Sequence, residues 1–165
     1  MRSCRGTLRK SASSRHPRNP PEGRMDYCFG LTATRHGMSR EQRDALCSFL
    51  SGTKGKFHHG LCRGGDEDGH HIARDLGYWI VGHPPSNPAL RAWLECDELR
   101  PEKPYLVRNK DIVDETIALI AVPSEPEERR RGGTWSTFRY ARKIGRPTVL
   151  ILPNGKIRQT TPEHC

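Results

Sequence analysis

The apolar positions along the chain change their period several times, and each period predicts one kind of element. Short apolar runs of strand length are typical of buried strands, and repeats of three to four residues are typical of helices. The predicted strands are 27–32, 56–60, 78–82, 116–123 and 146–153. The predicted helices are one that begins after Ser39, one within 61–77 that closes at Gly77, and those at 88–99, 105–115 and 134–144.

Turn and cap residues support these boundaries. Ser39 with Gln42 three positions later is a capping box, which marks a helix start. The stretch "HPPSNP" at 83–88 prevents regular structure for several residues, and Gly145 ends the last helix. Strands that alternate with helices predict an α/β fold with a mostly parallel sheet of roughly five strands.

A parallel sheet also predicts where a ligand binds. Ligands of such sheets lie at the carboxyl ends of the strands, near the point where the strand order reverses. The four predicted loops at that edge are 32–38, 60–65, 83–87 and 123–134.

Charge divides the chain into a tail and one domain. Residues 1–24 contain seven Lys or Arg and one acid, a formal charge of +6, which leaves +3 of the total of +9 for residues 25–165. The tail is rich in Ser, Pro and Arg, so we expect it to be disordered. A mis-called start, with Met25 as the natural first residue, is the alternative. Residues 25–165 are expected to form a single domain.

The tail has no apolar segment of a secretory signal, and no apolar run approaches the roughly 18 residues of a membrane helix. A cytoplasmic protein without membrane contact is therefore expected.

The stretch "RRRGGTWSTFRYARK" at 129–143 raises the first question of chemistry. Gly132, Gly133 and Thr134 open a helix after an apolar strand. Such a helix start offers free N–H groups and a positive dipole end to a phosphate, but two glycines can also serve only as a tight entry turn. Trp135, Phe138 and Ala141 are spaced by three, so these side chains are expected to face the sheet.

A second Gly-rich step, "CRGGD" at 62–66, also lies between a strand and a helix. Gly64 and Gly65 are candidates for a backbone cradle, and Asp66 is a candidate acceptor for a ribose hydroxyl. An Asp at a helix start is more commonly a cap.

Other groups of residues indicate a particular chemistry less strongly than the two Gly-rich steps. Histidines and cysteines are numerous, but "HHGLC" at 58–62 has no zinc spacing and neighbouring His58 and His59 point to opposite faces of a strand, so we expect no metal. Arg108 is either an anion partner over the pocket or part of a solvated helix face. No Ser-His-Asp order or G-x-S-x-G elbow supports acyl chemistry.

Five motifs span about 26–153: "GLTATRHGMS", "FHHGLCRGGD", "VGHPPSNPALRA", "KPYLVRNKDIVDET" and "RRGGTWSTFRYARKIGRP". Together they resemble a group of phage and bacterial proteins within the SLOG superfamily. This superfamily joins DNA-processing protein A with the LONELY GUY-type phosphoribohydrolases. The resemblance implies a three-layer Rossmann-like fold that binds nucleotides or nucleotide-derived ligands. Some members are enzymes, some are sensors and some bind single-stranded DNA.

Comparison with the LONELY GUY-type motif P-G-G-x-G-T-x-x-E implies roles for particular residues. Arg108 takes the place of the catalytic Arg, should the chain be an enzyme, and Gly133 and Thr134 take the place of the phosphate-binding step. The motif's Glu is replaced by Thr137, so a carboxylate needed for glycoside cleavage is missing. The carboxylates that could replace it are Asp66, Asp111, Asp114 and Glu128. The insert at 124–131 is either a lid over bound phosphate or a solvated loop.

Three hypotheses follow. The first is a binding protein or sensor for a nucleotide or nucleotide-like phosphate, with no cofactor. Its phosphate would lie at 132–134 with help from Arg35 and Arg108, and its ribose or base near 64–66. The second is a nucleoside-5′-monophosphate phosphoribohydrolase. The third, ranked last because the domain holds only +3, is a single-stranded DNA-binding module that uses the tail and 129–131. Whether the chain forms a homo-oligomer stays open.

Overall fold

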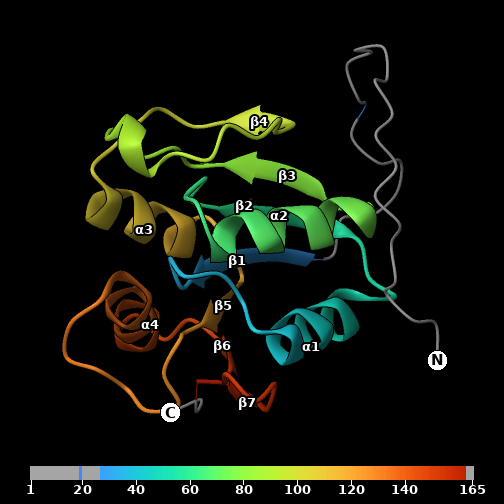
Figure 1. The fold of residues 1–165 in the computed structure, drawn as a ribbon, viewed down its shortest axis with the longest axis vertical. Helices are drawn as coiled ribbons and strands as arrows, with labels where there is room; N and C mark the ends of the chain where they lie inside the picture. The colour runs from blue at the N-terminus through green and yellow to red at the C-terminus, as the bar shows by residue number, and fades with distance from the viewer. Residues whose placement is uncertain (1–18, 20–26, 163–165) are drawn as a thin grey trace.

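The computed structural model describes Asn19 and residues 27–162, so the predicted disorder of the tail lies outside the described residues. One seven-stranded sheet has the order β4-β3-β2-β1-β5-β6-β7 (Figure 1). All pairs are parallel except β6 with β7. The strands are β1 (Tyr27–Ala33), β2 (Gly55–His59), β3 (Trp79–Gly82), β4 (Glu98–Leu99), β5 (Ala118–Val122), β6 (Thr148–Ile151) and β7 (Ile157–Thr160).

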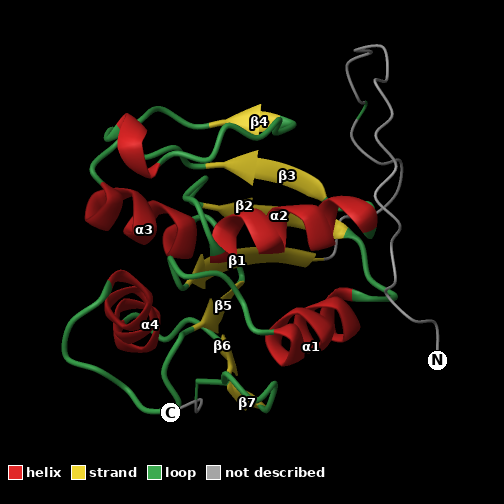
Figure 2. Ribbon diagram, in the orientation of Figure 1, coloured by secondary structure: helices red, strands yellow, loops and turns green. Residues whose placement is uncertain are grey.

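Four α-helices cover the two faces of the sheet (Figure 2). They are α1 (Arg40–Leu50), α2 (Gly65–Asp75), α3 (Tyr105–Asp114) and α4 (Gly133–Lys143). Helices α1 and α2 pack together, as do α3 and α4. Strand β5 shows the division: Ile120 and Val122 join the core with α1 and α2, whereas Leu119 and Ala121 pack toward α3 and α4. A sheet buried on both faces explains the continuous apolar run of β5.

The predicted architecture is confirmed, as are the five predicted strands and four of the five predicted helices. The capping box at Ser39 is formed: Gln42 N donates to Ser39 Oγ, and Ser39 N donates to Gln42 Oε1, both at 3.0 Å. The two additional strands lack an apolar signal. Strand β4 has two residues, and β7 is a mostly exposed strand that follows the turn at 154–155.

The predicted helix at 88–99 is wrong. Only a 3₁₀ turn, η1 (Pro88–Leu90), and strand β4 form there. Apart from the short-range bonds from Arg91 N to Pro88 O and from Leu94 N to Ala92 O, backbone groups of this segment bond to a neighbouring loop: Arg63 N donates to Leu90 O and Ala92 N donates to Leu61 O. Trp93, which the periodicity places on the buried face, is 70% exposed. Tertiary hydrogen bonds have overridden a weak helical period.

Candidate functional site

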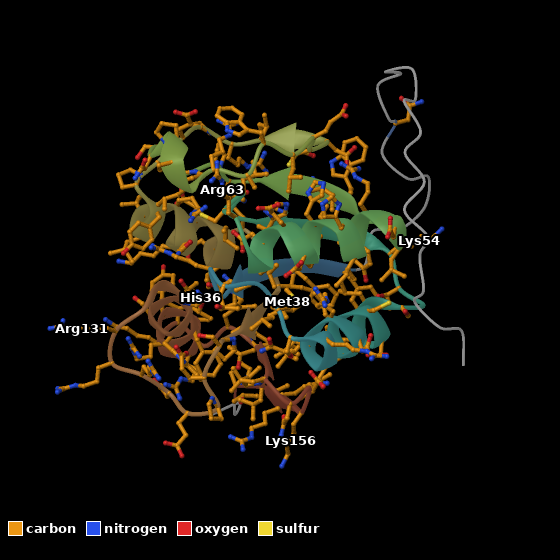
Figure 3. All side chains as sticks on the ribbon, viewed as in Figure 1. His36, Met38, Lys54, Arg63, Arg131 and Lys156 are labelled. Carbon is orange, nitrogen blue, oxygen red and sulfur yellow. The ribbon has the colours of Figure 1, made fainter. Side chains whose placement is uncertain are left out.

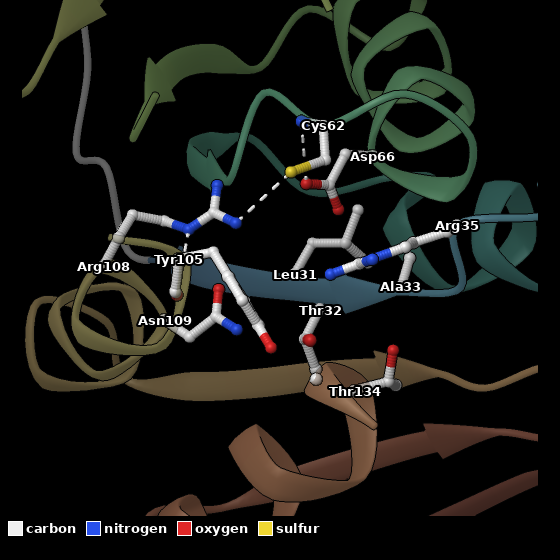
Figure 4. Close-up of a pocket in the computed structure, with 11 residues that line it drawn as sticks. Leu31, Thr32, Ala33, Arg35, Cys62, Asp66, Tyr105, Arg108, Asn109 and Thr134 are labelled. Atoms are coloured by element: carbon white, nitrogen blue, oxygen red, sulfur yellow. Dashed lines mark hydrogen bonds between the residues drawn. The ribbon is translucent and has the colours of Figure 1, made fainter. Parts of the chain in front are cut away.

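Two adjoining pockets lie at the predicted edge of the sheet. The strand order reverses between β1 and β5, and the pockets lie beyond the carboxyl ends of these strands. The inner pocket is lined by Leu31, Thr32, Ala33, Arg35, Cys62, Asp66, Tyr105, Arg108, Asn109, Gly133 and Thr134 (Figure 4). The outer pocket is lined by Thr34, Arg35, His36, Tyr105, Ser124, Glu125, Arg131, Gly132, Gly133, Thr134 and Trp135.

Arg108 forms the base of the inner pocket. It lies in the first turn of α3 and its side chain is buried. Its Nη1 donates to the carbonyl oxygens of Gly60 and His83, the latter at 2.9 Å, and its Nη2 lies 3.3 Å from Cys62 Sγ. These contacts fix the guanidinium between the ends of β2 and β3. Arg108 is thus a held positive charge in the pocket, and the interpretation as a solvated helix face is wrong.

Asp66 lies opposite Arg108, in the first turn of α2. Its Oδ2 accepts from Cys62 N at 3.2 Å, and the N–H of Gly60 is a second donor to the carboxyl group. Burial raises the pKa of Asp66 to about 6, although the Arg108 guanidinium and the two N–H donors act in the opposite direction. The pocket therefore contains a carboxyl group that titrates close to neutral pH.

Arg35 reaches into the same space from the loop after β1 (Figure 4). Its guanidinium carbon lies 5.2 Å from the centroid of the Tyr105 ring, which is a cation–π distance. Arg35 is exposed and lines both pockets. Arg35 is therefore the exposed cation of the site, whereas Arg108 is the buried one.

The start of α4 provides the third positive feature. Gly132 precedes the helix with φ of +115°, and no side chain among the described residues caps it. Helix α1, by contrast, has the Ser39 hydroxyl at this place. The first N–H groups of α4 and the positive end of its dipole therefore face the two pockets, which share Gly133 and Thr134.

Gly64 and Gly65 have a different place from the one predicted for a cradle. Neither lines the two pockets described above. Gly64 has φ of +93°, and a Cβ there would collide with the carbonyl oxygen of Arg35. Gly65 N donates to Thr34 O at 2.8 Å. Both glycines let the start of α2 approach the loop that carries Arg35, and any contact of theirs with a ligand stays a prediction.

The structure separates the four carboxylates that could replace the missing Glu. Thr137 is buried, and its hydroxyl donates back to Gly133 O at 2.7 Å, so it is a helix-internal contact. Of the four, Asp66 lines the pocket. The other three pair elsewhere: Asp111 with Lys103, Asp114 with the Tyr140 hydroxyl, and Glu128 with Arg139 and Arg142.

The lining residues that the sequence did not single out include Tyr105, Asn109 and Cys62. Arg108 and Asn109 follow Tyr105 by three and four residues on α3, so all three can line one pocket, and this periodicity was a usable signal. Cys62 carried no such signal. Burial raises the pKa of its thiol, and its contact with Arg108 depends on the fold.

The loop at 124–131 is attached to α4. Arg139 donates to the carbonyl oxygens of Arg129 and Arg130, at 2.6 and 2.9 Å, and the Trp135 indole N–H donates to Glu125 at 3.0 Å. Arg131 points away from the body of the molecule (Figure 3). Trp135, Phe138 and Ala141 are buried against the sheet as predicted, so these aromatics belong to the core.

Four of the described histidines form two buried pairs, and each pair contains one residue of β2. His58 Nδ1 lies 2.9 Å from His83 Nε2, and His59 Nε2 lies 2.9 Å from His70 Nδ1. Burial lowers the pKa of His58, His70 and His83 to about 4 and that of His59 well below its usual range, so all four are neutral at pH 7. The prediction that His58 and His59 face opposite ways is confirmed. Two groups of possible metal ligands result, His58 with His83 and Glu115, and His59 with His70 and Cys96.

Among the described residues, no helix combines the length and apolar character needed to cross a membrane.

Comparison with known proteins gives structural neighbours but no sequence relatives. No protein-family model matches the chain. No curated protein sequence matches it either. The molybdenum cofactor binding protein from Rippkaea orientalis is similar in structure, with a TM-score of 0.61, 18% identity and 76% of each chain covered.

Two further solved structures are similar. The protein TM1055 has a TM-score of 0.54 and 18% identity, over 74% of this chain and 72% of that one. DNA processing protein A from Streptococcus pneumoniae has a TM-score of 0.56 and 19% identity, over 75% of this chain and 50% of that one. At these identities the likeness concerns the fold. The chain therefore has the predicted Rossmann-like fold, which it shares with these three structures.

Proposed function

We propose that the two pockets together bind a nucleotide or a nucleotide-derived phosphate ligand. The observation that carries this proposal is the uncapped start of α4, which opens onto a space that also holds Arg35 and Arg108. Free N–H groups, a helix dipole and two guanidinium groups converge there, and together they favour an anion. The fold agrees, since one of its structural neighbours is named for binding a cofactor.

Within this space the proposal assigns the phosphate to Gly132, Gly133 and Thr134. Arg35 is exposed and lines both pockets, so its side chain can turn to the phosphate oxygens. Arg108 is committed to protein carbonyls, so it contributes mainly a fixed charge. The ribose or base would then lie over Asp66, whose carboxylate can accept a hydrogen bond from a hydroxyl group.

The first prediction concerns Gly133. A Cβ at this position meets its nearest neighbour, a Tyr105 ring carbon, at 3.6 Å, so the Cβ that Gly133→Ala or Gly133→Asp adds has room. An Asp in the first helical turn also favours the helix dipole, so the fold is retained. Its carboxylate, however, lies where the phosphate is proposed and repels it. A panel of nucleotides should raise the melting temperature of wild type and Gly133→Ala but leave Gly133→Asp unshifted.

Both outcomes of this experiment are informative. If no nucleotide stabilises the wild type, the binding proposal loses its support. If Gly133→Asp responds as the wild type does, a ligand binds elsewhere.

Asp66 favours a second candidate function, hydrolysis of the N-glycosidic bond of a nucleoside 5′-monophosphate. This bond breaks through a sugar of oxocarbenium character, which a carboxylate stabilises or attacks through an activated water. Asp66 is a carboxyl group in the pocket, it lies beside Arg108, and burial raises its pKa to about 6. It would take the part that the motif gives to a Glu.

The second prediction tests this candidate. Asp66→Asn keeps the shape of the side chain and its ability to accept the N–H of Cys62. It should abolish release of free base from AMP and related monophosphates while nucleotide-induced stabilisation persists. Base release that survives in Asp66→Asn, or that the wild type never shows, rules out the hydrolytic role of Asp66 and leaves binding as the function.

A further inference from the structure

The two histidine pairs on β2 have no part in the proposed nucleotide site. Each pair lies close to a third possible metal ligand, which is Glu115 for His58 and His83 and Cys96 for His59 and His70. In each group the ligand atoms lie within 4.8 Å of one another. The two groups differ in their hydrogen bonds, and this difference favours one of them as a binding site for a metal ion.

The group of His59, His70 and Cys96 is committed to hydrogen bonds. His59 Nδ1 lies 3.1 Å from the Leu61 N–H, which can only donate, so Nδ1 is an acceptor. The proton of neutral His59 is therefore on Nε2, which donates to His70 Nδ1. Both nitrogens of His59 are used, and binding a metal through Nε2 would require removal of that proton.

The group of His58, His83 and Glu115 is not committed in this way. His58 Nε2 is buried and has no hydrogen-bond partner among the described residues. No second contact therefore fixes the tautomer of His58, and its proton can lie on Nε2 and leave the Nδ1 lone pair free. That Nδ1 lies 2.9 Å from His83 Nε2 and 3.8 Å from Glu115 Oε2. Ligand atoms around a zinc ion are separated by similar distances, given bonds of about 2.0–2.2 Å.

We propose that His58, His83 and Glu115 form a binding site for a single divalent cation of the zinc class, with the remaining coordination positions left to water. Two imidazoles and one carboxylate are a ligand set that this class of cation accepts. The two imidazoles are buried at the ends of β2 and β3, and Glu115 at the end of α3 is 35% exposed. The ion enters from the side of Glu115 and joins three elements.

The neighbouring charges accommodate the ion. Arg100 Nε donates to Glu115 Oε2 at 2.9 Å, and its Nη1 donates to Glu98 Oε2 at 3.0 Å. Lys56 also pairs with Glu98, so the two cations are balanced by two carboxylates. A carboxylate has two oxygens with two lone pairs each, and Glu115 can keep Arg100 while it binds the ion.

Spacing along the chain could not have shown this site. Its ligands come from β2, from the residue after β3 and from the residue after α3, and they are 25 and 32 positions apart. Zinc motifs that can be read from a sequence have at least one pair of ligands within a few residues.

The test uses the full chain, stripped of metal, with Zn²⁺ and Co²⁺ as probes. Calorimetric titration should show one equivalent of Zn²⁺, and the ion should raise the melting temperature. Loss of a group that only supports a ligand lowers metal affinity about tenfold or more, so Glu115→Gln and His83→Gln should weaken binding at least that much. Cys96→Ser, in the other group, should bind like the wild type. Bound Co²⁺ should show no thiolate charge-transfer band.

Four results overturn the proposal. They are the absence of stoichiometric Zn²⁺ binding, wild-type affinity in both Glu115→Gln and His83→Gln when circular dichroism shows them folded, loss of binding in Cys96→Ser, and a thiolate band with Co²⁺. The last two would place the ion in the group of His59, His70 and Cys96.

Discussion

At the scale of single residues, burial decides the chemistry of the pocket. In the sequence, the position of Asp66 is also typical of a helix cap, and that of Arg108 is also typical of a solvated helix face. In the fold both side chains are buried and lie in one pocket. Arg35 and the start of α4 complete the site, whereas Gly64 and Gly65 serve the close approach of α2 to the loop after β1.

The third prediction is a pH dependence of stability caused by Asp66. Burial raises the pKa of its carboxyl from 3.8 to about 6, so the folded state binds more protons than the unfolded state between these values. The stability linked to the protonated group is complete below pH 3.8 and is lost as the pH rises to about 6. Asp66→Asn has no carboxyl group at this position, so it should not lose this stability as the pH rises.

Denaturant unfolding of both proteins from pH 4 to pH 7 checks this prediction. Asp66→Asn should equal the wild type near pH 4 and exceed it at pH 7 by on the order of 1–3 kcal/mol, since one unit of pKa corresponds to about 1.4 kcal/mol. The lowered pKa values of the four buried histidines affect both proteins alike and cancel in the difference. A constant difference across the range would show that Asp66 does not titrate as stated.

At the scale of elements, α4 has two tasks. Its start opens onto the pockets, and its outer face holds the preceding loop through Arg139, which donates to the carbonyl oxygens of Arg129 and Arg130. Residues 124–131 are either a lid or a solvated loop. The two interpretations differ in whether a bound ligand protects the loop from protease.

The fourth prediction concerns that attachment. Arg139→Ala removes both bonds and the ion pair with Glu128, so the loop should detach more often and become open to protease. Trypsin should cleave after 129–131 several-fold faster in this variant, as measured by mass spectrometry of the fragments. Arg146→Ala, in which the altered Arg lies after α4, serves as control. If bound nucleotide then slows cleavage in the wild type, the lid is supported, and equal rates with and without nucleotide favour the solvated loop.

At the scale of the whole molecule, the formal net charge is distributed unevenly along the sequence. The first 24 residues hold +6 of the total of +9, and the pockets lie within the sheet domain. One structural neighbour is named a DNA processing protein, which keeps nucleic acid as a partner to be tested.

The fifth prediction follows from this distribution. If the chain binds single-stranded oligonucleotides, deletion of residues 2–24 should weaken binding and flatten its dependence on salt, because six of the seven basic side chains that can release counterions lie in 2–18 and the seventh is Arg24. The same deletion should leave the nucleotide-induced thermal shift unchanged. Fluorescence anisotropy at several salt concentrations measures the first effect. An unchanged salt slope would locate DNA contacts on the domain, with the exposed 129–131 as the first candidates.

The sequence by itself determined the alternation of strands and helices, the parallel core and the edge at which the pocket lies, because apolar periodicity and strand direction are local properties. It failed at 88–99, where backbone groups bond to residues 61–63, and at β4 and β7, which have no apolar pattern. Only the tertiary structure decided that Asp66 meets Arg108, that Thr137 turns back to its own helix, and that His58 and His83 lie beside Glu115. The reason is physical: desolvation and side-chain pairing depend on which distant segments meet, and no period along the chain records that.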